Sequence, residues 1–162
     1  MIKSEVHCQG LVSLVLRGPD GEIKQSIEKE HNIVTNAGLE HNILLLKGGA
    51  TAPNVVSHMG VGTGSTAAAA TDTALGSEFT IASGSYERPT VTSTVINNAS
   101  NVGDSLQYRA TFDAGIGTGA ITEAGLFNAS TAGTMTNRVV FDVINKGAND
   151  SLECTWKMTV TR

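Results

Sequence analysis

The chain has 162 residues, the usual size of one domain and enough to bury a substantial core. Charged residues make up 16%, aromatic residues only 4%, and glycine fills 18 positions. This composition of small side chains favours strands. The formal net charge of −4 argues against a nucleic-acid binder, which needs a basic surface, and against attachment to a membrane surface. We therefore predict one domain over residues 1–162.

The longest apolar runs have four residues, at 43–46 and 67–70, whereas a spanning helix needs roughly 20. The first five residues show no apolar signal region, so we expect a soluble protein made in a cytoplasm. The two cysteines, Cys8 and Cys154, are too few for a disulfide framework and too far apart for a metal motif. We predict two ordinary strand thiols. The alternative is a bridge within the chain or between subunits.

The first part of the chain has the pattern of a β-hairpin. Residues 10–17 are rich in Leu and Val, residues 18–21 (GPDG) form a strong turn signal, and residues 22–29 form a second strand with flanking charges. A short extended segment follows at 31–34.

Residues 37–47 form the clearest helical pattern. Thr35 or Asn36 is suited to cap its N-terminus, and Gly48 is suited to end it. The apolar side chains at helical spacing are Leu39, Ile43 and Leu46.

The rest of the chain is strand-like and rich in alternating patterns. In residues 105–113 and 151–161 apolar and polar side chains alternate, which indicates one buried and one solvent-facing side, with Trp156 in the core. The expected strands are residues 57–61, 90–97, 105–113, 120–127, 135–143 and 151–161. Together with the hairpin, about eight strands predict a mainly β protein. Its expected architecture is an antiparallel β-sandwich, jelly-roll-like, with one short helix in the N-terminal half.

Two glycine-rich segments share the pattern G-[VI]-G-T-G, at 60–64 and 115–119. The first lacks the lysine of a phosphate-binding loop and opens no βαβ unit, so nucleotide binding is not expected. We interpret both as flexible loops of similar conformation. Residues 62–76 are expected to form a loop or a short alanine-rich helix outside the core.

No catalytic, cofactor-binding or metal-ligating residue is assigned, and we do not expect an enzyme. Cys8 and its neighbour His7 point to opposite faces of a strand, which disfavours proton transfer between them. Alternation turns Glu123 toward solvent; the alternative is burial beside Arg109 or Arg138. The four histidines are scattered along the chain and do not have the spacing of metal ligands. They are His7, His31, His41 and His58.

Several segments resemble structural proteins of tailed bacteriophages and prophages. Residues 57–78 (SHMGVGTGSTAAAATDTALGSE) are similar to a stretch common in that group, and so are residues 117–128 (GTGAITEAGLFN). Residues 33–39 (IVTNAGL) resemble its N-terminal segment, and residues 140–156 resemble its C-terminal hairpin. One departure is Ala68, where the group's pattern has proline. The resemblance covers most of residues 31–160 and implies a virion protein made in the host bacterial cytoplasm.

Within that group, small β-rich proteins often act as trimeric decoration (cement) proteins. The expectation is therefore a homotrimer that binds between subunits of the major capsid protein, with residues 1–9 as a possible N-terminal arm that pairs with a neighbouring sheet edge. A tail, collar or baseplate component is the alternative. A third possibility is a carbohydrate-binding module, which needs exposed aromatic side chains, and the candidates are Tyr86, Tyr108 and Trp156.

Overall fold

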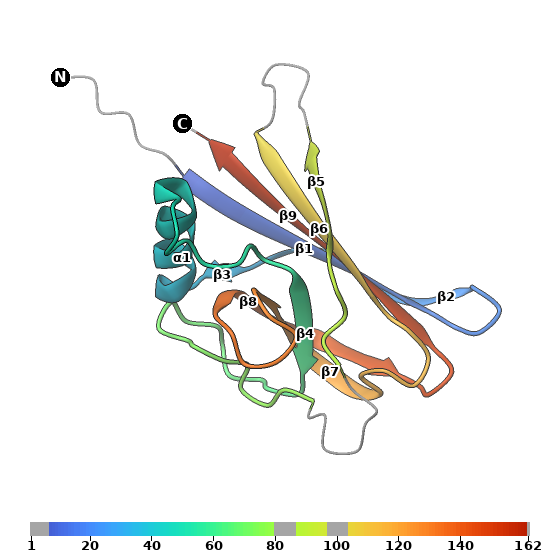
Figure 1. Ribbon diagram of the computed structural model, residues 1–162. Coiled ribbons are helices and arrows are strands. Elements are labelled where there is room, and N and C mark those ends of the chain that lie inside the picture. Colours follow the sequence, from blue (N-terminus) through green and yellow to red (C-terminus); the bar gives the residue numbers. More distant parts are fainter. Residues whose placement is uncertain (1–6, 80–86, 97–103, 162) are drawn as a thin grey trace.

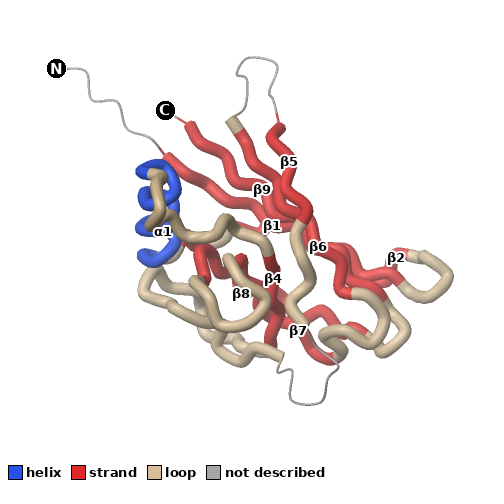
Figure 2. The backbone as a smooth tube through the Cα atoms, viewed as in Figure 1, coloured by secondary structure: helices blue, strands red, loops and turns tan. Residues whose placement is uncertain are grey.

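The computed structural model describes residues 7–79, 87–96 and 104–161 (Figure 1). Two antiparallel sheets form a β-sandwich, and one helix packs at its side (Figure 2). The predicted fold class, mainly β with one short helix, is confirmed. None of the helices in the described part of the chain has the length and apolar character that a membrane crossing requires.

The larger sheet has five strands in the order β2-β1-β9-β6-β5. The predicted hairpin joins β1 to β2, and the Gly21 amide donates to the Gly18 carbonyl at 2.9 Å in its turn. The strands are β1 (His7–Arg17), β2 (Ile23–His31), β5 (Thr92–Ile96), β6 (Ser105–Phe112) and β9 (Ser151–Thr161). Residues 7–9 of the expected arm thus belong to β1, and residues 1–6 lie outside the described residues.

The smaller sheet has four strands in the order β3-β8-β7-β4. They are β3 (Ile33–Val34), β4 (His58–Gly62), β7 (Gly119–Phe127) and β8 (Met135–Lys146). The extended segment expected at residues 31–34 contains β3, a two-residue strand that pairs with β8.

The core lies between the two sheets, and its buried residues come mainly from β1, β4, β6, β7, β8 and β9. Trp156 is completely buried there, as the alternation of β9 predicts. The main contributors from the five-stranded sheet are Val12, Leu14, Leu16, Phe112, Leu152 and Trp156, and those from the other sheet are Met59, Val61, Ile121, Leu126, Val139 and Ile144.

Both cysteines are free thiols, as predicted. Cys154 pairs with Leu14 across β1 and β9, whereas Cys8 pairs with Val160 six residues further along the strand pair. Six residues of strand span about 20 Å, far more than the roughly 7 Å limit for disulfide-bonded Cα atoms, so no bridge joins these two within one chain.

Helix α1 (Asn36–Lys47) begins and ends as predicted. The Thr35 hydroxyl accepts from the Gly38 amide at 2.9 Å, and Gly48 caps the C-terminus with φ +63°. The helix packs on β8 at Gly38, and the buried His41 is hydrogen-bonded to the Asn54 carbonyl. Its apolar stripe is instead exposed on the outside of the molecule, and it consists of Leu39, Ile43 and Leu46.

Candidate functional site

A buried carboxylate lies on the outer face of the four-stranded sheet. Pairing of β7 with β8 shifts register between Ile121 and Glu123, so that Ile121, Ala124 and Leu126 face the core while Glu123 faces the other side. The expectation that Glu123 faces solvent is therefore wrong, because this face is covered. Residues 63–79 cover this face, and Glu123 is completely buried.

The covering segment binds Glu123 through its backbone. The amides of Gly64 and Ser77 donate to Oε1 at 2.9 and 2.7 Å, and the amide of Gly76 donates to Oε2 at 2.9 Å. Arg138 adds two charged donors, with Nε at 3.0 Å and Nη2 at 2.9 Å from Oε2. The alternative that Glu123 is buried and paired with Arg138 is thus the correct one.

Arg138 also holds the covering segment. Its Nη1 donates to Asp72 Oδ2 at 2.7 Å, and its Nη2 donates to the Thr66 carbonyl at 3.0 Å. The Ala69 amide donates to the same Asp72 oxygen at 2.8 Å. These hydrogen bonds, that of Ala69 first, hold the pKa of Asp72 below its ordinary value of 3.8.

The first glycine-rich segment therefore has a different role from the one predicted. Gly62 ends β4, and a Cβ atom on Gly64 would lie 2.5 Å from Glu123 Oε1. Glycine permits this close approach of the backbone to the carboxylate. The second segment is instead a turn with positive φ at Gly115 and Gly117, so the two segments do not share a conformation.

A second ion pair joins Glu78, at the end of the covering segment, to Arg88. Arg88 donates from Nε to Glu78 Oε1 at 2.5 Å and from Nη2 to Oε2 at 2.7 Å. Its guanidinium carbon lies 3.5 Å from the centre of the Phe127 ring, and Leu75 packs in the same small apolar cluster as Phe127. The expectation that residues 62–76 lie outside any core is therefore wrong for Leu75.

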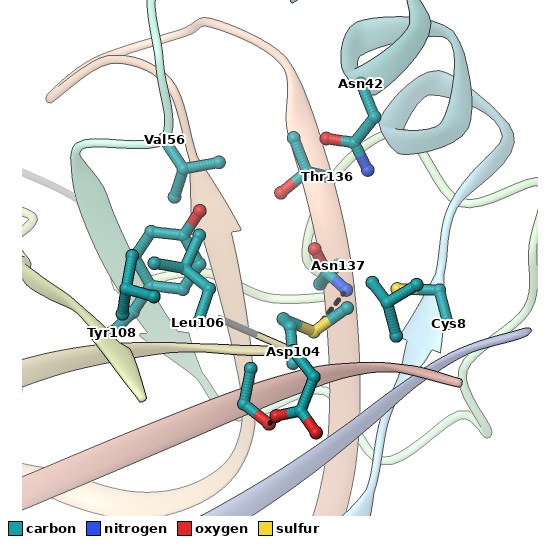
Figure 3. Close-up of a pocket in the computed structure, with 12 residues that line it drawn as sticks. Cys8, Asn42, Val56, Asp104, Leu106, Tyr108, Thr136 and Asn137 are labelled. Carbon is teal, nitrogen blue, oxygen red and sulfur yellow. Dashed lines mark hydrogen bonds between the residues drawn. The ribbon is translucent and has the colours of Figure 1, made fainter. Parts of the chain in front are cut away.

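A cavity of about 340 Å³ opens at the end of the sandwich where β1 begins and β9 ends. Figure 3 shows Cys8, Leu106 and Tyr108 among its lining residues, together with Asn42 of α1. The Asn137 amide group donates to the Met158 sulfur at 3.5 Å beside it (Figure 3). The remaining lining residues are Val56, Val95, Asp104, Ser105, Thr136 and Val160.

Burial raises the pKa of two side chains that line this cavity. Burial raises the pKa of the Cys8 thiol, which keeps it protonated and weakly nucleophilic at neutral pH. Burial, followed by the nearby Cys8, also raises the pKa of Tyr108. The cavity is at the small end of the size range of ligand pockets.

The histidines lie on separate elements. His41 is buried, with Nε2 at 2.8 Å from the Asn54 carbonyl, and His58 Nδ1 lies 2.8 Å from the Ser57 hydroxyl. His31 ends β2, and the side chain of His7 falls outside the description. Among the described residues, no three His, Cys, Asp or Glu side chains gather where they would hold a metal ion.

Of the aromatic candidates for a sugar platform, Trp156 is buried in the core and Tyr108 lines the cavity. Tyr86 lies outside the described residues. Arg109, the other possible partner of Glu123, lies instead 4.0 Å from the carboxylate of Glu153 at the surface.

With this geometry established, the chain was compared with known proteins. No family model, curated protein or solved structure matches it. The buried cluster of Glu123, Arg138 and Asp72 and the end cavity are therefore interpreted on their own chemistry. The sequence offered one signal for the cluster, a lone acid in an apolar strand, but none for the cavity, which is formed by residues distant in sequence.

Proposed function

We propose that this protein is a structural component of a tailed-bacteriophage virion, and specifically a decoration protein that binds between subunits of the capsid. In this role it stabilises the head through buried area and many equivalent contacts, and no chemical step is required.

The observation that carries the proposal is the contact between the two segments with the clearest resemblance to phage structural proteins. Gly64, Gly76 and Ser77 belong to the first segment, and their amides bind Glu123 in the second. Short glycine- and alanine-rich sequences resemble one another by chance. Here, however, the two resembling segments are hydrogen-bonded to each other through Glu123. Both resembling segments therefore belong to one folded substructure of this protein, and this contact is what supports the proposal.

Exposed apolar surface further supports a role in binding. Leu46 is 84% exposed on α1, and Val55, Val95 and Val160 are at least half exposed near the helix or at the cavity. Surfaces of this kind mark contact sites on proteins that work by association.

The copy number per virion tests the proposal. Purified particles are analysed by quantitative mass spectrometry, with the major capsid protein as the internal standard. Hundreds of copies per particle are expected for a decoration protein. A few tens or fewer would contradict decoration and indicate the neck, tail or baseplate, and absence from particles would contradict any virion role.

The proposed arm is tested by a truncation that respects the strand. Residues 7–9 pair with β9, so only residues 1–6 are removed. The truncated protein is expected to unfold at the same temperature as the full chain and to lose its binding to particles that lack the protein. Ile23→Ser, at an exposed position on β2, is the control that keeps binding. Undiminished binding of the truncated chain would refute the arm.

A further inference from the structure

Helix α1 carries three of its large apolar side chains on the face away from the protein, whereas Leu44 and Leu45 are half-buried. Leu39, Ile43 and Leu46 are 52%, 64% and 84% exposed, whereas Gly38 and His41 face the body and are buried. A surface helix normally turns its large aliphatic side chains toward the core.

The docking of α1 prevents a rotation that would bury this stripe. Any side chain at position 38 would collide with the Thr136 carbonyl, so only glycine permits this close approach of the helix to β8. The Thr35 cap and the hydrogen bond from His41 to Asn54 fix the helix on the same side. The packing of the helix therefore fixes the stripe on the outer surface of the protein.

The spacing of the stripe is that of a helix-pairing seam. Leu39, Ile43 and Leu46 are four and then three residues apart, which corresponds to positions d, a and d of a heptad. His41 then falls at position f, opposite the seam, and this is the side that packs on the body.

The charges beside the seam indicate what covers it. Glu40 and Lys47 both occupy e positions, and they are exposed. When two such helices pair antiparallel, e positions lie beside e positions, so Glu40 of each helix lies next to Lys47 of the other, twice by symmetry. In a parallel pair, e positions instead face g positions, and the g residue within α1 is the uncharged Asn42.

We propose that α1 pairs antiparallel with α1 of a second copy of this chain, around a two-fold axis near Ile43. The contact buries the seam of both copies and joins two Glu40–Lys47 pairs. This inference does not depend on the proposed function. It predicts a dimer, whereas the resemblance to phage proteins implies a trimer, so one measurement separates the two.

The molar mass of the intact chain in solution is the first test, measured by sedimentation over a range of concentrations. Wild type is expected to be a dimer, and Ile43→Lys is expected to raise the dissociation constant by about 30-fold or more, as for the central residues of interfaces. Ile23→Lys, equally exposed but on β2, is the matched control and stays dimeric. Circular dichroism checks that both variants fold.

A monomeric or trimeric wild type would overturn the proposal, and so would a dimer that Ile43→Lys leaves intact. The proposal is also contradicted if Ile23→Lys dissociates as much as Ile43→Lys does, because the effect would then not be specific to α1.

Charge reversal tests the antiparallel arrangement itself. Glu40→Lys and Lys47→Glu each place like charges at both pairs, and each is expected to weaken its own dimer by about threefold to tenfold. When the two variants are mixed, the introduced lysine and glutamate lie beside residues of opposite charge, so native mass spectrometry is expected to show the heterodimer in excess of both homodimers. A statistical mixture would overturn the antiparallel pairing.

Discussion

Replacing Glu123 with glutamine keeps the size of the side chain and removes its charge. The wild-type carboxylate accepts five N–H donors, namely the amides of Gly64, Gly76 and Ser77 and two nitrogens of Arg138. A glutamine has only one side-chain oxygen. In either orientation its own NH₂ group faces at least two of these donors, and the Arg138 guanidinium loses its buried counter-charge.

The expected cost follows from this geometry. Breaking a buried ion pair by changing one partner costs about 3–5 kcal/mol when the remaining charge is left unpaired. Arg138 keeps its ion pair with Asp72, so we expect the lower end of this range, about 3 kcal/mol. Domains have only about 5–15 kcal/mol of stability, so the loss is a large share of the total. For a chain of this length the expected decrease in Tm is about 6–12 °C.

Urea unfolding measures the effect, with Trp156 fluorescence as the signal, because this is the only tryptophan and it is buried. The matched control is Glu153→Gln, whose side chain is 37% exposed and 4.0 Å from Arg109. Such a surface pair is worth about 1 kcal/mol at most. If Glu123→Gln unfolds at the same urea concentration as Glu153→Gln, the proposed role of the buried carboxylate is wrong.

Three further predictions test the same substructure and the thiols. Gly64→Ala is expected to lower the free energy of unfolding by about 1–3 kcal/mol, since the new Cβ crowds Glu123; an unchanged unfolding curve would contradict this. The pKa of Asp72 is lowered in the folded state, so its carboxylate stabilises the protein above about pH 4 and this contribution disappears as the pH falls through the folded pKa. Wild type and Asp72→Asn should therefore converge in stability between about pH 5 and pH 2, and a constant difference in thermal unfolding would be evidence against it. A thiol reagent should label Cys8 in the native protein because Cys8 is exposed, although its thiol reacts slowly; Cys154 should be labelled only after unfolding, because it is completely buried and burial raises its pKa to about 12. Rapid native labelling of both cysteines, read by mass spectrometry, would refute this.

The strands were largely predictable because their signals are local. Alternation in β6 and β9 and the turn at residues 18–21 each depend on neighbouring residues, and the expected ranges agree with the observed strands within a few residues. The limits of α1 were predictable for the same reason, since Thr35 and Gly48 cap it through local backbone geometry.

The surroundings of Glu123 were not predictable from local pattern. Alternation indicates on which face of a strand a side chain lies, but not what covers that face. Here the cover is a segment about 50 residues earlier in the chain, and it binds Glu123 through three backbone amides. Every residue except proline has a backbone N–H group, so the sequence does not indicate which of these groups bind a carboxylate.

The orientation of α1 shows a similar limit. Helical spacing identified Leu39, Ile43 and Leu46 as one stripe, but periodicity alone does not tell which face packs against the body. That choice depends on the close approach of Gly38 to Thr136, a residue almost 100 positions further along the chain.

The central position of β1 and β9 in the five-stranded sheet has a consequence for synthesis on the ribosome. β1 lies between β2 and β9, so it forms the hairpin with β2 early but remains without its second partner until β9 has emerged. Contacts between such distant segments slow folding, and the waiting strand exposes backbone groups that pair readily with other chains. Overproduction at high temperature should therefore favour inclusion bodies, and slower translation or a chaperone that shields strand edges should increase the soluble yield.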